Sequence, residues 1–207
     1  MASPSRMRIV PPLKSHPLHQ LWYGSRAVGG SAAGSILGLN PYQSAQALWE
    51  YLTHRADKPP PSEAMLRGIE EESTIRAFYC RRFHVEGCPL QVIDSEHDFI
   101  RAQIDFMDED FNRPAEFKST RSKAALDAMK RKQVPSFWRP QLAHQCMILG
   151  KTEVDVFVYD GNEYYYALFT IDPAYCVMLR KREVEFWQRY VLTDTPPSNN
   201  KLKLVIG

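Results

Sequence analysis

The feature that most constrains this chain is the stretch 99–118, which reads as two extended segments joined by an acidic turn. In the first segment apolar and polar side chains alternate: Ile100, Ala102, Ile104 and Phe106 on one side, Arg101, Gln103 and Asp105 on the other. A period of two is typical of a β-strand that buries one face and leaves the other polar. The second segment, 115–119, follows the turn 107–114, so the stretch predicts two neighbouring strands.

Charged side chains gather where these strands face each other. Asp105 ends the polar row of the first strand, and Glu116 and Lys118 project from one face of the second while Phe117 points to the other. Two carboxylates with an amine beside them suit a hard divalent cation such as magnesium or manganese. The alternative is a solvated surface, because Glu-x-Lys is frequent in exposed hairpins.

Composition narrows the class of protein. The chain has 207 residues, 44% of them hydrophobic, and a net charge of +2, which indicates one well-filled core and restricts any DNA-binding surface to a local patch. Its four cysteines show no Cys-x-x-Cys pair, which argues against a disulfide framework, a zinc site or an iron–sulfur cluster. Without a signal peptide or an apolar run of transmembrane length, we expect a cytoplasmic protein with no membrane partner.

The chain divides into one domain, 1–207, with distinct parts. We expect a loose lead-in over 1–15, N-terminal helices over 16–58, a core over 62–193 and a peripheral tail over 194–207. Pro17 and Ser44 predict two helix starts, and Ser31 predicts the cap of another helix that ends at Gly38.

The residues Gly29-Gly30-Ser31 allow two interpretations. One is a tight turn followed by a helix cap. The other is an anion site, in which backbone N–H groups, the Ser31 hydroxyl and nearby Arg26 hold a phosphate.

A longer helix is predicted over 62–83, with an apolar stripe formed by Met65, Ile69, Ile75 and Tyr79. Glu72 falls inside this stripe, where a bare charge would be costly, so we expect a metal ion or a basic partner. The alternatives are a solvated position at a frayed end or an ion pair with Arg76, four residues on.

The rest of the chain alternates helices with one hairpin. A basic helix follows the second strand and brings Arg121 and Lys123, which belong either to a solvated face or to a phosphate-binding one. Pro135–Pro140 begin a helix that carries Gln141 and Gln145 on one face, and base rates favour core hydrogen bonding for such amides. Two strands joined at 161–162 and a final helix capped by Asp172 complete the chain, with apolar positions such as Val177 expected to pack along that helix.

These motifs, taken in order, resemble the phage lambda-type alkaline exonucleases, also called YqaJ-type viral recombinases, of the PD-(D/E)xK nuclease superfamily. The matching residues are Trp22 and Arg26, Gly29-Gly30-Ser31, Ile36 to Tyr42, Gly68 with Glu72, Asp105, Glu116-Phe117-Lys118, and Gln141 to Gln145. Two positions depart from the family: Ala32 stands where an acidic residue is frequent, and Gln103-Ile104 stand where proline precedes the aspartate.

The resemblance implies an α/β fold with a restriction-endonuclease-like core, in which helices flank a mixed central sheet. It implies magnesium-dependent 5′-to-3′ digestion of one strand of duplex DNA, with manganese as a substitute, by a ring-shaped homotrimer. It also implies a phage or prophage origin and a single-strand annealing protein as partner.

Residue roles follow from the same resemblance. The metal ligands would be Glu72, Asp105, Glu116 and the Phe117 backbone carbonyl. Lys118 and Gln141 would orient the attacking water, with Lys118 helping to deprotonate it, and Arg26 and Ser31 would hold the 5′-terminal phosphate. The rival hypotheses are a structure-specific or restriction-like endonuclease of the same superfamily and a non-catalytic DNA-binding recombination protein.

Overall fold

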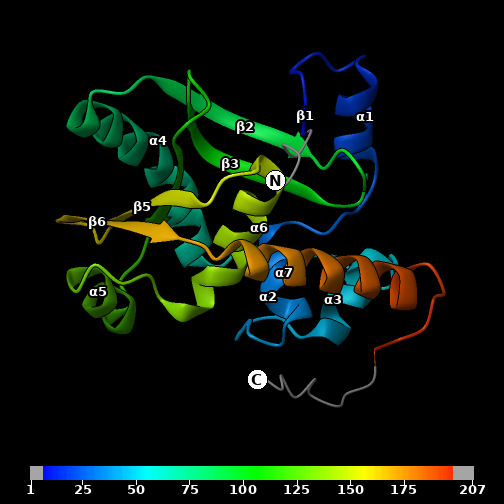
Figure 1. Cartoon of the computed structure of the whole chain (residues 1–207). Helices are drawn as coiled ribbons and strands as arrows, with labels where there is room; N and C mark the ends of the chain where they lie inside the picture. The colour runs from blue at the N-terminus through cyan, green and yellow to red at the C-terminus, as the bar shows by residue number, and fades with distance from the viewer. Residues whose placement is uncertain (1–6, 198–207) are drawn as a thin grey trace.

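The alternating stretch forms two adjacent strands, β3 (Arg101–Asp108) and β4 (Pro114–Ser119), in a computed structural model that describes residues 7–197. They lie in a six-stranded sheet whose order follows the chain, β1 to β6 (Figure 1). The other strands are β1 (Arg8–Ile9), β2 (Gly87–Ile93), β5 (Glu153–Tyr159) and β6 (Tyr164–Thr170). All neighbours are antiparallel except β4 and β5, which are parallel. The predicted mixed sheet is confirmed.

The strands β3 and β4 diverge soon after the turn that joins them. They pair only at Phe106 with Ala115 and at Met107 with Pro114. Beyond these pairs β4 no longer pairs with β3: Val28 bridges the start of the freed edge at Ile100, and side chains of the helix Arg139–Leu149 reach the rest. This opening creates the candidate site.

Helices cover both faces of the sheet (Figure 1). On one face α4 (Glu63–Phe83) packs Ile75 and Tyr79 against Phe106, Phe117 and Phe157. On the other, α6 (Arg139–Leu149) contributes most of its buried residues to the main core, and α7 (Pro173–Phe186) and α2 (Gly30–Ile36) pack against it. The remaining helices are α1 (Pro17–Gly24), α3 (Ala45–Leu52), α5 (Lys123–Lys130) and a short 3₁₀ turn, Ser136–Trp138.

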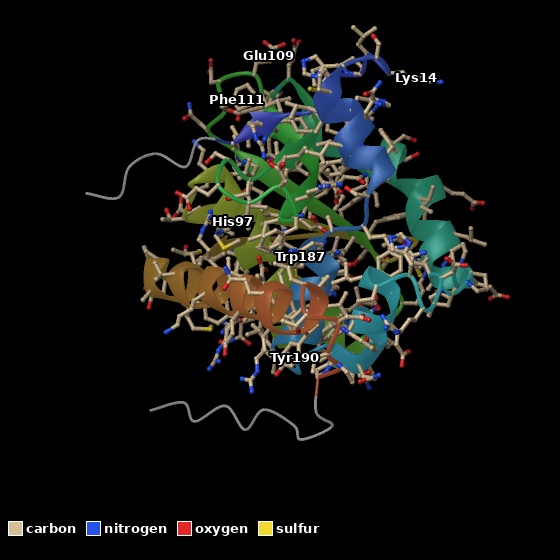
Figure 2. The ribbon with its side chains drawn as sticks, turned by 90° about the vertical axis from the view of Figure 1, so that its right-hand side faces the viewer. Lys14, His97, Glu109, Phe111, Trp187 and Tyr190 are labelled. Atoms are coloured by element: carbon tan, nitrogen blue, oxygen red, sulfur yellow. The ribbon has the colours of Figure 1, made fainter. Side chains whose placement is uncertain are left out.

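The C-terminal helix is anchored to the segment that leads into β3. It ends in a π-helical turn, Trp187–Val191, where Trp187 stacks on Phe99 with ring centroids 4.5 Å apart. Figure 2 shows Trp187 near the middle of the molecule and Tyr190 below it, whereas Glu109 and Phe111 mark the β3–β4 turn at the top. The acidic turn therefore lies away from this anchor.

Several local predictions are correct. Pro17 lies in the first turn of α1, Ser44 caps α3 through the N–H of Ala47 at 3.1 Å, and Asp172 caps α7. All four cysteines are free thiols, as expected. Within residues 7–197, no helix is long and apolar enough to cross a membrane.

Other local predictions are wrong. Gly29, not Ser31, is the N-cap of α2, because the extended backbone before the helix ends at Gly29 and Ser31 already lies in the first turn. Arg8–Ile9, placed in a loose lead-in, forms an edge strand on β2. Val177 is 71% exposed on α7, because it lies on the solvent side of that helix. Residues 198–207 of the predicted tail lie outside the described part.

The apolar stripe predicted for α4 is only half correct. Ile75 and Tyr79 are buried, but Met65 and Ile69 are 60% and 67% exposed, because the first half of the helix does not pack against the sheet.

Candidate active site

Asp105 lies on β3 at the point where β4 departs. Its Oδ2 accepts the backbone N–H of Phe117 at 2.8 Å, so a side chain replaces a ladder hydrogen bond between the strands. Burial and the nearby Glu116 carboxylate raise the pKa of Asp105 well above its usual value, while Lys118 and the Phe117 N–H act in the opposite direction. The position therefore favours a compensating positive charge.

Glu116, on β4, is almost completely buried, and both of its oxygens are hydrogen-bonded. Oε1 accepts Nε2 of Gln141 at 2.6 Å and lies 2.5 Å from Nζ of Lys118. Oε2 accepts Nε2 of Gln145 at 2.6 Å. These three donors fix the carboxylate in one orientation.

Lys118 lies between the carboxylates and the first turn of α6. Its Nζ donates to Oε1 of Gln141 at 3.0 Å. Burial lowers the pKa of this amine, but Glu116 and Asp105 together outweigh it, so the pKa lies above its ordinary value. The two carboxylates thus favour the ammonium form, which donates to Gln141, and the role of Lys118 in taking a proton from water stays a prediction.

The open edge of β3 is satisfied by side chains. The carbonyls of the alternate residues Arg101, Gln103 and Asp105 accept, respectively, His144 Nε2 at 2.8 Å, Gln145 Nε2 at 3.2 Å and Arg76 Nε at 3.2 Å. Unpaired buried carbonyls would be costly, so these donors allow the strands to separate.

Glu72 does not join the other two carboxylates. Its Oε1 forms an ion pair with Arg76, which is the alternative that the sequence left open. Among residues 7–197, no group of three or more His, Cys, Asp and Glu side chains is arranged to hold a metal ion. Glu72 is nevertheless close enough to contribute to the raised pKa of Asp105, after burial and Glu116.

The donor set of Asp105 and Glu116 fits a hard divalent cation. Both are oxygen ligands of the kind that magnesium takes, and Asp105 lies where a positive charge is favoured. The carboxylates that the sequence placed on adjacent strands are therefore brought together, with Lys118 and Gln141 beside them. The role of the Phe117 carbonyl stays a prediction.

Asp105 opens into a cleft of about 380 Å³ that extends to the N-terminal helices. The cleft is lined by Trp22, Ser25, Arg26, Ala27, Gly29, Gly30, Ser31, Tyr51, Lys58, Arg101, Gln103, Asp105, Gln141 and Gln145. Arg26 and Ser31 thus share one cavity with Asp105, although they are far from it in sequence. A Cβ at Gly30 would lie 3.0 Å from Cγ of Gln141, so a larger residue here would require the Gln141 side chain to shift by a few tenths of an ångström.

Arg26 is held by the protein as well as exposed to the cleft. Its guanidinium donates to the carbonyls of Tyr51 and Ala56, pairs with Asp57 at 2.7 Å, and lies 4.4 Å from the centre of the Tyr51 ring. A side chain fixed in this way presents its charge in one direction.

The two DNA-backbone candidates differ. Arg121 pairs with Glu71 at 3.1 Å and covers Gly161, where a Cβ would lie 2.5 Å from its Nη2. Lys123 is exposed at the start of α5. Neither lines the cleft.

Sequence reasoning missed the helix α6 as a bridge between strands. Gln145 is a buried, hydrogen-bonded amide, as base rates favour, but its partner Glu116 is indicated in the sequence only by the spacing of four between Gln145 and Gln141 on one helical face. His144 is fully buried beside Glu183, at 2.7 Å. Burial lowers its pKa, but Glu183 raises it by more, and no sequence pattern pairs these residues.

Comparison with known proteins agrees with this architecture. The sequence profile of the YqaJ-like viral recombinase domain matches residues 21–153. The uncharacterized protein YqaJ of Bacillus subtilis is 26% identical over 183 residues, which cover 84% of this chain and 56% of that protein. The chain therefore spans little more than half of its curated relative.

Solved structures show the same fold. The alkaline exonuclease LHK-Exo from Laribacter hongkongensis superposes with a TM-score of 0.72 at 18% identity, over 84% of this chain and 92% of that one. LHK-Exo in complex with dAMP gives 0.71 at 17% identity, over 81% and 89%. A phage-related exonuclease from Haemophilus somnus gives 0.58 at 12% identity, over 81% and 94%. With a family profile that covers most of the chain and a shared fold, this protein belongs to the YqaJ-like viral recombinase family.

Proposed function

We propose that this protein is a magnesium-dependent 5′-to-3′ exonuclease that degrades one strand of duplex DNA from a 5′-phosphorylated end. The observation that carries the proposal is one cleft that contains Asp105 at one side and Arg26 and Ser31 at the other. Gln141 lines the same cleft, and it bonds to Lys118 and Glu116, which both interact with Asp105.

Asp105 and Glu116, with the Phe117 carbonyl, are the proposed metal ligands, and Glu72 is the proposed further carboxylate because it contributes to the raised pKa of Asp105. A bound divalent ion lowers the pKa of a water ligand and neutralises charge that develops on the phosphate. Glu72 would have to exchange its Arg76 partner for this role.

Lys118 and Gln141 would orient the water. Gln141 accepts from Lys118 and donates to Glu116, which fixes the direction of its amide. Glu116 and Gln141 hold the Lys118 ammonium in place next to the proposed metal ligands. A positive group fixed in advance stabilises the negative charge that develops on the phosphodiester in the transition state, and this is the proposed role of Lys118.

Arg26 and Ser31 are the proposed partners of the 5′-terminal phosphate. A guanidinium matches phosphate oxygens in geometry and charge, and the Ser31 hydroxyl is exposed to the same cleft. Arg121 and Lys123 stay candidates for contacts farther along the DNA backbone.

The wider assembly is part of the same proposal. It includes a ring-shaped homotrimer and a single-strand annealing partner. Digestion of one strand from its 5′ end leaves a 3′ single-stranded overhang, which we propose is used in phage-type recombination in the cytoplasm. Light scattering of the purified protein tests the trimer, and a monomer at micromolar concentration would remove it.

The test of the activity compares DNA forms. Linear duplex, supercoiled plasmid and nicked plasmid are incubated with the protein in magnesium or in EDTA. We expect nucleotide release from the linear duplex only, and only with magnesium.

Other results assign other functions. Cleavage of the supercoiled plasmid would identify an endonuclease of the same superfamily. Binding to DNA ends without any release in magnesium or manganese would identify a non-catalytic recombination protein.

A further inference from the structure

We infer that Gln145 is a positioning residue, which sets the spacing between Asp105 and Glu116 by bridging the two strands that carry them. The inference rests on the proposed function, since it gives those carboxylates a metal to share. Gln145 does not touch the DNA in this account and acts only through Glu116 and β3.

The bridge is a single amide with two acceptors. Nε2 of Gln145 donates to the Gln103 carbonyl on β3 at 3.2 Å and to Oε2 of Glu116 on β4 at 2.6 Å. Both partners accept hydrogen bonds, so the amide nitrogen must face them and its orientation is fixed. Gln103 lies two residues before Asp105, so the amide spans the gap next to the site.

Backbone hydrogen bonds between β3 and β4 do not set this spacing at the site. The last pair between β3 and β4 is Phe106 with Ala115, and β4 is otherwise supported by β5 on its far side. The Phe117 N–H bonded to Asp105 also joins the two strands at the site, but it makes no contact with the Glu116 carboxylate. The orientation of Glu116 therefore depends on α6.

Gln141 does not make Gln145 redundant. Gln141 donates to the other oxygen, Oε1, which also faces Lys118, whereas Gln145 is the donor to Oε2. Without Gln145, the Glu116 carboxylate would be held through Oε1 alone, by Gln141 and Lys118, and Oε2 would be free to move. The Gln103 carbonyl would also lose its donor. Hydrogen bonds of this kind around metal ligands typically change metal affinity by about 10- to 100-fold.

Gln145→Met is the direct test, because methionine has nearly the same length but no donor. Gln46→Met is the matched control: Gln46 also donates its Nε2 to a glutamate, Glu50, at 2.9 Å on α3, and it does not line the cleft. Manganese binding is measured by electron paramagnetic resonance of the full chain without DNA, and the free energy of unfolding is measured in EDTA.

We expect Gln145→Met to weaken manganese binding about 10- to 100-fold, and to raise the magnesium concentration for half-maximal cleavage by the same factor. The KM for DNA ends at saturating magnesium should stay unchanged, and Gln46→Met should match wild type throughout. If the methionine variant does not fold, Gln145→Asn keeps the amide but is one methylene too short to reach both partners, and we expect the same direction of change.

Two results would overturn the inference, and they differ in scope. Manganese binding within twofold of wild type in a folded Gln145 variant removes the positioning role and leaves the proposed function intact. Manganese binding that is unchanged by Glu116→Gln removes the proposed metal site and the positioning role together.

Discussion

Replacing Lys118 by methionine separates the role of its charge from the folding of the site. In the structure the ammonium lies 2.5 Å from Glu116 and 3.0 Å from Gln141, and its side chain is 22% exposed. The substitution keeps the length of the side chain and removes the charge next to two carboxylates. We expect cleavage to fall by about 100-fold or more, as for the loss of a group that acts on the transition state.

The cost in stability follows from what Glu116 retains. Breaking a fully buried ion pair costs about 3–5 kcal/mol, because the remaining charge has no partner. Here Glu116 keeps two amide donors and Lys118 is partly exposed, so we expect about 2 kcal/mol. For a chain of this size that corresponds to a decrease in Tm of about 4–8 °C.

The loss of folding stability in Lys118→Met should depend on pH. Asp105 has a folded-state pKa above its unfolded value, so folding stability falls as pH rises through the interval between the two. Loss of Lys118 raises that pKa further, because the ammonium opposes the shift. The difference from wild type is therefore largest above this interval and shrinks as pH falls towards the unfolded pKa of about 3.9.

Urea unfolding of both proteins in EDTA, at several pH values, measures this difference. A deficit that is the same at every pH would refute the electrostatic reasoning. Cleavage by the folded variant at the wild-type rate would remove Lys118 from the chemistry.

Three further predictions concern other charged residues. Arg26→Ala should lose the preference for 5′-phosphorylated over 5′-hydroxyl ends in a competition digest, with Asp57→Asn as a control for its structural partner; equal loss on both ends would indicate a general backbone contact. Glu72→Gln should raise the magnesium concentration for half-maximal cleavage about 10-fold, and an unchanged metal dependence would limit Glu72 to its ion pair with Arg76. Burial opposes but Arg180 lowers the pKa of Asp94, so wild type should lose stability as pH falls through that lowered pKa, whereas Asp94→Asn should lose less over the same range; parallel pH profiles of unfolding would contradict this.

Local chemistry made much of the site predictable. Period-two alternation identified β3, and the spacing of Glu116 and Lys118 placed both on one face of β4. Helix starts at Pro17 and Ser44 followed from proline and capping preferences. These signals act within a few residues, so the sequence contains them completely.

Contacts between distant elements were not predictable in this way. The hydrogen bond between Gln145 and Glu116 requires β3 and β4 to diverge, and no residue pattern in the sequence predicts that divergence. Met65 and Ile69 lie on the same apolar stripe as Ile75 and Tyr79, so the sequence predicts burial for all four. Only the last two are buried, because the sheet covers only the second half of the helix. Tertiary packing decides such cases.

The proposed end site and metal site together determine which strand of a duplex the protein digests. A linear duplex carries a 5′-phosphate at one end only and a different label on each strand, and wild type and Glu116→Gln are compared in magnesium. We expect wild type to release nucleotides from the 5′-phosphorylated strand alone, and Glu116→Gln, folded and able to bind the end, to release none. Equal release from both strands, or release by Glu116→Gln at the wild-type rate, would contradict the proposed function.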